Sequence, residues 1–138
     1  MQLKVKLDDG AYMLERAHAT DAGADIRTPV DVEVPAKGSA VVHTGVHVEL
    51  PPGHAGVIKS KSGLNVMHGI ISSGLIDEGY TGEIVVKLYN LGEGGVYLAR
   101  GSKITQLVIV PVEYAGFVEV DEIAGGPRGD GGFGSSGR

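Results

Sequence analysis

Short runs in which apolar and polar residues alternate recur along most of the chain. A period of two residues is typical of β-strands that turn one face to a core and the other to solvent. A strand that is apolar on both faces indicates burial on both sides or at a subunit contact, and residues 104–112 have this pattern. We expect further strands at residues 3–7, 30–34, 46–50 and 84–89, and a last one containing Val118 and Val120.

Turn signals separate these runs, and only residues 62–68 have a pattern that predicts a helix. The chain of 138 residues contains 23 glycines and 6 prolines, and Pro51-Pro52-Gly53 ends one predicted strand. Many short strands indicate an all-β antiparallel sandwich, barrel or jelly roll. We expect one domain at residues 1–124, followed by a flexible glycine-rich tail at residues 125–138.

The composition argues against several classes of partner. The net charge is −5 and no long basic run is present, so no nucleic-acid polymer is expected as a ligand. No apolar run approaches the roughly 20 residues of a membrane span, and the N-terminus is unlike a secretory signal. The lack of cysteine fits a soluble, cytoplasmic protein. If the ligand is a polyanion, such an acidic chain needs a metal cation to help neutralise it.

Five stretches place polar residues beside glycines where predicted strands end: residues 22–25, 59–64, 74–82, 100–107 and 128–136. Each of them alone also fits a turn, a helix cap or a core amide. Gln106 lies inside an apolar run and therefore needs a hydrogen-bonding partner. His43 and His47 share one face of a strand pattern without a third ligand, so we expect solvated histidines rather than a metal site.

The stretch 74–82 is the most informative, because three glycines bracket an expected tight hairpin that carries Asp77 and Tyr80. Asp77 follows two apolar residues, which can partly desolvate its carboxylate and keep it basic enough to activate water. Tyr80 can stack against a base or a sugar. In the tail, Arg128 can bind phosphate in a bidentate manner, and Phe133 can cover an aromatic base.

Together and in this order, the five stretches resemble those of the trimeric dUTPase family, the deoxyuridine triphosphate nucleotidohydrolases. The resemblance runs from about Ala22 to Ser136, which is most of the chain. It implies a β jelly roll that assembles as a homotrimer, with three active sites at the subunit contacts. It also implies Mg²⁺-assisted hydrolysis of dUTP to dUMP and pyrophosphate, a reaction that keeps uracil out of DNA and supplies dUMP for dTMP synthesis.

The resemblance also implies roles for individual residues. Asp77 matches the general base that activates water, and Tyr80 matches the residue packed under the deoxyribose. Asp25 matches the carboxylate that reaches Mg²⁺ through water, so no direct protein ligand to the metal is expected. The backbone of residues 74–85 would read uracil, and the tail would close over the nucleotide as a lid. The positions matched to substrate contacts are Lys61, Ser62, Gly63, Gly74, Ile76, Tyr80, Val85, Lys87, Lys103, Gln106, Arg128, Phe133, Gly134, Ser135 and Ser136.

The chain departs from the family pattern at Lys61, where arginine is usual, and carries Lys103 where either arginine or lysine occurs. Lysine keeps the charge but loses the bidentate fork of arginine. A dCTP deaminase shares the fold and the hairpin motif, but its pattern calls for a glutamate where this chain has Lys87. A dUTP-binding regulatory protein would keep the motifs without turnover. A structural jelly roll would have no reason to carry them.

Overall fold

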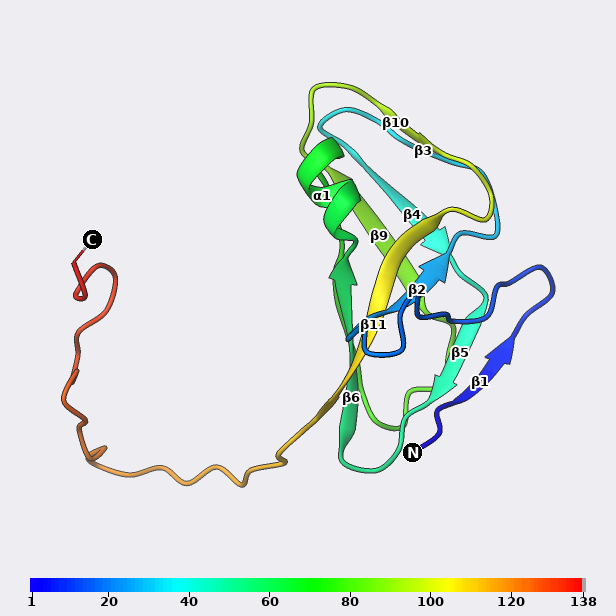
Figure 1. Ribbon diagram of the computed structural model, residues 1–138. Coiled ribbons are helices and arrows are strands. Elements are labelled where there is room, and N and C mark those ends of the chain that lie inside the picture. The colour runs from blue at the N-terminus through cyan, green and yellow to red at the C-terminus, as the bar shows by residue number, and fades with distance from the viewer. Residues whose placement is uncertain (138) are drawn as a thin grey trace.

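The strands form four small antiparallel sheets in the computed structural model, which describes residues 1–137 (Figure 1). The largest sheet contains β2 (Ala24–Arg27), β11 (Lys103–Pro111), β6 (His54–Ser60) and β8 (Ser73–Ile76), in this order. A second contains β4 (Ser39–His43), β9 (Val85–Asn90) and β7 (Ile70–Ile71). The two-stranded sheets pair β1 (Lys4–Leu7) with β5 (Val46–Glu49) and β10 (Val96–Leu98) with β3 (Val32–Val34). With one short helix, this is the expected all-β jelly roll.

Alternation along the strands places the core as predicted. In β9, Val86 and Leu88 are buried, whereas Val85, Lys87 and Tyr89 between and beside them are exposed. The predicted strands at 3–7, 30–34, 46–50, 84–89 and 104–112 are confirmed, with ends shifted by one or two residues. The largest completely buried apolar side chains are those of Ile26, Val34, Val42, Val46, Ile70, Leu88, Ile104 and Leu107.

β11 lies inside the largest sheet, between β2 and β6. Its first half is buried on both faces, because Ile104 and Thr105 are neighbours in the chain and are both at most 1% exposed. From Val108 onward the strand is only half-buried. The predicted burial on both faces is thus confirmed for the first half.

The predicted helix at residues 62–68 is α1 (Ser62–His68). It ends at Gly69, whose φ of 69° is the left-handed conformation that glycine adopts without a Cβ clash. No residue of α1 is buried, and Val66 and Met67 are exposed. In the described part of the chain, no helix is long and apolar enough to cross a membrane.

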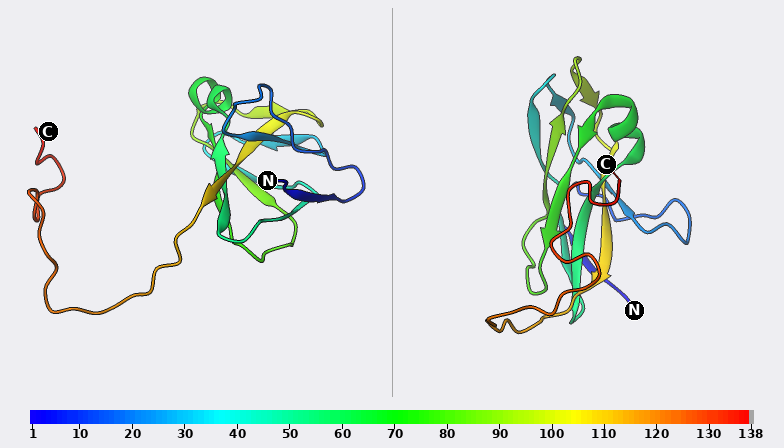
Figure 2. Two further views of the ribbon diagram at one scale, coloured as in Figure 1. Left: turned by 60° about the horizontal axis from the view of Figure 1, so that its bottom comes forward. Right: turned by 90° about the vertical axis from the view of Figure 1, so that its left-hand side faces the viewer.

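The predicted strand at Val118 and Val120 is wrong. Both side chains are exposed, and residues 112–137 contain no helix or strand. A strand needs a partner for its backbone groups, and this segment extends away from the sheets in Figure 1 and in the left view of Figure 2. The departure begins at residue 112, before the expected boundary at 125, although Val112 still donates a backbone hydrogen bond of 2.8 Å to Gly53. Arg138, the last residue of the predicted tail, lies outside the described residues.

Candidate active site

Asp77 lies in a tight turn directly after β8, where the backbone N–H of Tyr80 donates to the carbonyl of Asp77 at 3.1 Å. The prediction of a hairpin is wrong, because the flanking strands do not pair with each other. β8 pairs with β6, whereas β9 pairs with β4 and β7. Residues 77–84 therefore connect two sheets, and we call this segment the site loop.

The site loop borders a cavity of about 280 Å³ between the ends of β8 and β9. The Tyr80 hydroxyl donates to the carbonyl of Glu83 at 2.7 Å, which fixes the ring within the loop. A Cβ at Gly82 would lie 2.5 Å from the Tyr80 hydroxyl oxygen, so this packing requires glycine. The cavity is lined by Ile58, Gly74, Leu75, Ile76, Asp77, Tyr80, Glu83, Ile84 and Val85.

The expected desolvation of Asp77 by its apolar neighbours is not found in this chain, because Asp77 is exposed. Successive side chains of β8 point alternately into the core and to solvent, which explains why Asp77 is not enclosed by its two apolar neighbours. Ile76 points into the core and is 7% exposed, whereas Leu75 points outward and is 69% exposed. In the part of the chain that the structure covers, the Asp77 carboxylate accepts no side-chain hydrogen bond, which leaves it available to solvent or a ligand.

Asp25, in contrast, is a buried carboxylate held by two cations. Only 3% of the residue is exposed, and its two carboxylate oxygens contact the amines of Lys61 and Lys103, the latter at 3.1 Å. Burial disfavours the charged carboxylate, but the hydrogen bonds and positive charges of the two lysines outweigh this effect and lower the pKa of Asp25. Asp25 is therefore ionised at neutral pH, and it draws Lys61 and Lys103 together.

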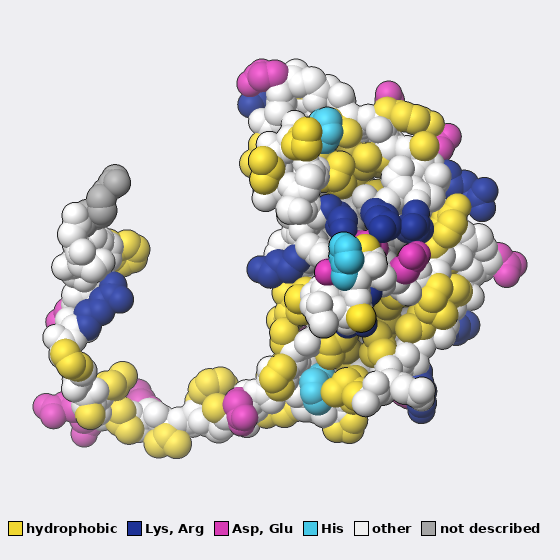
Figure 3. Space-filling view, viewed as in Figure 1, with side chains coloured by type: hydrophobic (Ala, Val, Ile, Leu, Met, Phe, Trp, Pro, Cys, Tyr) yellow, Lys and Arg dark blue, Asp and Glu magenta, His cyan; other side chains and the backbone are white. Residues whose placement is uncertain are grey.

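These three residues line a second cavity, of about 330 Å³, on the outer face of the largest sheet. Gln106 of β11 lies in register with Asp25 of β2 on one side and Lys59 of β6 on the other, so the three side chains share one face. Figure 3 shows Lys and Arg side chains gathered near the middle of this side of the body. The remaining lining residues are Ala17, Asp21, Ala22, Gly23 and Val108.

Gln106 has the partner that the sequence requires, since its side-chain amide donates to the carbonyl of Ser60 at 2.8 Å. A Cβ at Gly23 would lie 2.1 Å from the Gln106 amide oxygen. Gly23, from the polar stretch 22–25, thus makes room for Gln106, from the polar stretch 100–107. Ser62 and Gly63 follow Lys61 at the start of α1 and are both exposed.

Two charged cavity residues, Lys59 and Glu83, were not among the predicted substrate contacts, although Lys59 lies in the polar stretch 59–64. Lys59 is two residues before Lys61 in a strand pattern, and this spacing signals that both lysines point to one side of the sheet. Glu83 carries no comparable signal in the sequence. Its role in the loop depends on contacts with Tyr80 and with Gly45, whose backbone N–H donates to the Glu83 carboxylate at 3.0 Å.

The tail residues are not brought to either cavity in this chain. Phe133 is completely exposed, and the Arg128 guanidinium donates within the tail, to the carbonyl of Gly131. Gly134, Ser135 and Ser136 are also exposed. Lys87 lines neither cavity, and its amine lies 5.1 Å from the centre of the Tyr89 ring.

The residues around Asp25 suit a magnesium ion that the ligand itself carries. Mg²⁺ commonly keeps several waters and binds through one or two carboxylates together with phosphate oxygens. Within residues 1–137 no group of three or more His, Cys, Asp or Glu side chains could hold a metal. The ionised carboxylate of Asp25 is an oxygen ligand of the kind that Mg²⁺ prefers, so this residue fits an ion that phosphates also hold, and its contact through water stays a prediction.

The expectation that His43 and His47 share a strand face is wrong, because Gly45, with a φ of 71°, turns the chain between β4 and β5. The His43 ring contacts the Glu83 carboxylate at 2.7 Å. His43 is nevertheless exposed, as expected, whereas only 20% of the His47 side chain is exposed. Both histidines therefore have partners in the protein.

Comparison with known proteins gives consistent matches over almost the whole chain. The dUTPase family model matches residues 9–137. A deoxyuridine 5'-triphosphate nucleotidohydrolase of Gloeothece citriformis is 43% identical over 141 residues, covering 99% of this chain and 97% of the relative. The protein of the same name from Thermobifida fusca is 46% identical over 136 residues and covers 96% of this chain and 76% of its own.

Solved structures agree with these sequence matches. A mutant dUTPase of Staphylococcus bacteriophage 80alpha with dUpNHpp superposes with a TM-score of 0.93 at 32% identity, covering 99% of both chains. A mutant dUTPase from phage phi11 of S. aureus, described with a structural Mg(II) ion, gives a TM-score of 0.83 at 29% identity over 89% of this chain. Motifs, fold and relatives lead to one conclusion: the chain belongs to the dUTPase family.

Proposed function

We propose that this enzyme hydrolyses dUTP to dUMP and pyrophosphate, with Asp77 as the general base. The oxygen of a water molecule bonds to the α-phosphorus, its proton passes to the Asp77 carboxylate, and the bond to the α–β bridging oxygen breaks. Pyrophosphate leaves with the electron pair of that bond. The observation that carries the assignment is an exposed carboxylate, without a competing side-chain partner among residues 1–137, at the rim of the cavity beside Tyr80.

The edge position of β8 supports recognition of uracil by the backbone. β8 pairs only with β6, so one of its sides carries free N–H and C=O groups. Such groups can pair with the donors and acceptors of a pyrimidine ring. Gly74, Ile76 and Val85 would shape a narrow slot for the base, and Tyr80, held by its hydroxyl, would pack under the deoxyribose and exclude a ribose 2′-hydroxyl.

The second cavity supplies positive charge for the triphosphate. Lys61 and Lys103 would contact phosphate oxygens, with Ser62, Gly63 and Gln106 as hydrogen-bonding neighbours. Mg²⁺ would neutralise further negative charge on the phosphates when it is bound, and Asp25 would contact it through water. Phosphoryl transfer depends mostly on such positioning and charge neutralisation, so an acidic chain can carry it out.

The site is incomplete in a single chain, which supports assembly as a homotrimer. Asp77 lines the cavity between β8 and β9, whereas Lys61 and Lys103 line a cavity on the outer face of the largest sheet. Arg128 and Phe133 belong to the tail and line neither cavity. One nucleotide must meet all of these groups at once, and neighbouring subunits of a closed ring can supply them.

Mixing two inactive variants tests the shared site. We expect Asp77→Asn and Arg128→Ala to be nearly inactive as pure proteins, because each lacks one required group at every site. Mixed in equal amounts by refolding together, they should regain about a quarter of wild-type activity, since that fraction of sites draws both intact groups from different subunits of a symmetric ring. No recovery, in trimers shown by mass spectrometry to be mixed, would place both residues in one subunit's site.

The substrate is tested by measuring pyrophosphate release from dUTP, dTTP, dCTP and UTP in the presence of Mg²⁺. We expect rapid release from dUTP alone, because the slot excludes the thymine methyl group and the packed Tyr80 ring excludes the ribose hydroxyl. Release of ammonia from dCTP would instead show a deaminase. Tight dUTP binding without pyrophosphate release would show a regulatory binding protein.

A further inference from the structure

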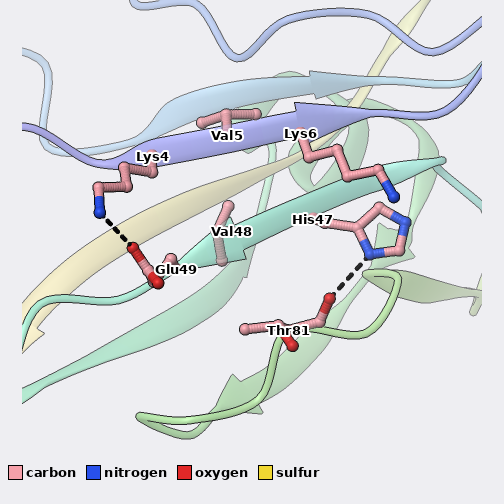
Figure 4. A pocket seen from close by; sticks show the side chains of 7 residues that line it. All are labelled: Lys4, Val5, Lys6, His47, Val48, Glu49 and Thr81. Atoms are coloured by element: carbon pink, nitrogen blue, oxygen red, sulfur yellow. Dashed lines mark hydrogen bonds and ion pairs between the residues drawn. The ribbon is translucent and has the colours of Figure 1, made fainter.

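His47 joins the first strands of the chain to the site loop. From β5, its Nδ1 lies 2.8 Å from the backbone carbonyl of Thr81, and its Nε2 lies 3.0 Å from the carboxylate of Asp8 (Figure 4 shows the Thr81 contact). A carbonyl and an ionised carboxylate can only accept hydrogen bonds. Both ring nitrogens must therefore carry a proton if both bonds are to form, which describes an imidazolium.

The charged groups next to His47 that are not paired with each other are one cation, Lys6, and one anion, Asp8, and the ring is hydrogen-bonded to the anion. Lys6 lies directly opposite His47 in the register of β1 and β5, whereas Lys4 is 2.9 Å from Glu49 and is neutralised by it. Asp8 carries the carboxylate that contacts the ring. An open cavity of about 460 Å³ lies beside the ring, and Lys4, Lys6, Glu49 and Thr81 line it together with His47.

The hydrogen bonds of His47 favour its charged form. The bond to the Thr81 carbonyl, followed by the bond to Asp8, raises the pKa of His47, while partial burial and Lys6 oppose the shift. A neutral ring can donate only one of the two bonds and turns a lone pair toward the other acceptor. Loss of the proton from His47 therefore removes one of its two hydrogen bonds, either the bond to Thr81 or the bond to Asp8.

Thr81 follows Tyr80 directly, so a bond to the Thr81 carbonyl fixes the loop beside the expected sugar contact. The same loop is anchored at Glu83, which receives the backbone N–H of Gly45. β5 and the turn before it thus hold the site loop at two points. The Glu83 carboxylate is held by the backbone N–H of Gly45, which does not titrate, and also contacts the His43 ring at 2.7 Å, whereas the Thr81 anchor depends on the His47 imidazole.

We propose that the protonated His47 is a positioning residue that fixes the site loop by bridging Asp8 and Thr81, so that nucleotide affinity depends on a proton outside the catalytic site. The inference rests on the proposed function. Because the folded state with its loop in place binds this proton more tightly, the bridge is complete at low pH. It is lost as the pH rises through the raised pKa of His47.

The test compares wild type with His47→Gln across the range from about pH 6 to about pH 8.5, where an imidazole of raised pKa loses its proton. At the low end we expect KM for dUTP to be about threefold to tenfold higher in the variant, the value of one hydrogen bond, with kcat little changed. The ratio of the two KM values should fall toward one as the pH rises. Dividing the KM of the variant by the KM of the wild type at each pH cancels the effect that titration of the nucleotide itself has on both values.

Asp8→Asn and His68→Gln complete the design. Asp8→Asn should lower the pKa of His47 measured by NMR and shift the change in KM to lower pH. His68→Gln removes an exposed histidine of α1 and should leave the KM profile as in wild type. A KM ratio between His47→Gln and wild type that stays constant with pH would overturn the proposal.

The inference can be separated from the proposed reaction. If the wild type releases no pyrophosphate, the proposed function fails, but the amides of residues 77–84 still report on the loop. Their hydrogen exchange should accelerate above the pKa of His47 in wild type and be fast at every pH in His47→Gln, relative to the rate of unstructured peptide. Equal protection in both proteins at low pH would contradict the bridge.

Discussion

Replacement of Asp77 by Asn is expected to reduce kcat by about a hundredfold to ten-thousandfold, the usual contribution of a positioned general base. Asparagine has nearly the shape of aspartate but cannot accept the proton of the attacking water. Because Asp77 is exposed and its turn is closed by a backbone hydrogen bond, the fold and nucleotide binding should remain intact. Pyrophosphate release measured at saturating dUTP, together with calorimetric binding of dUpNHpp, checks both parts.

Asp9→Asn is the matched control, because it makes the same chemical change at an exposed carboxylate that lines neither cavity. It should keep wild-type kcat and the same melting temperature. Near-normal turnover by the Asp77 variant would remove Asp77 from the role of base. Loss of binding along with turnover would point to a structural role for its carboxylate.

Local pattern was sufficient for the helix and for the strands β1, β3, β5, β9 and β11. Val86 and Leu88 alternate with Val85 and Lys87 in the sequence, and the structure buries the first pair and exposes the second. α1 lies at the predicted residues and ends at a glycine. These features depend on neighbours in the chain, which a sequence displays directly.

Pairings between distant segments could not be predicted in the same way. The glycines around Asp77 fit a hairpin, but whether β8 and β9 pair with each other depends on β6 and β4, which compete for them. The contact of Asp25 with both Lys61 and Lys103 arises only because β2, β6 and β11 lie side by side. The bridge made by His47 likewise joins residues 8 and 81, which no local pattern relates.

The buried carboxylate of Asp25 also bears on how this acidic protein would bind the triphosphate at the proposed site. Two lysine amines at one buried carboxylate are held in place and partly neutralised before any ligand arrives. Preorganised charges of this kind need not be rearranged when phosphate enters, which is the source of much electrostatic catalysis. The lysine at position 61 suits this arrangement, since an ammonium group has three donors and can contact a phosphate oxygen while it stays beside the carboxylate.

Deletion of residues 129–138 is expected to lower kcat/KM for dUTP by at least about a hundredfold, because the groups proposed to cover the base and contact phosphates are removed together. The melting temperature should not change, since in the described part of this segment the side chains of Phe133, Ser135 and Ser136 are exposed and the backbone bonds stay within the tail. Closing a glycine-rich lid costs conformational entropy, so Phe133→Ala alone should mainly raise KM. Asp130→Asn, which changes an exposed tail carboxylate, is the control and should behave as wild type. A truncated enzyme that keeps the full rate would show that the tail plays no part in hydrolysis.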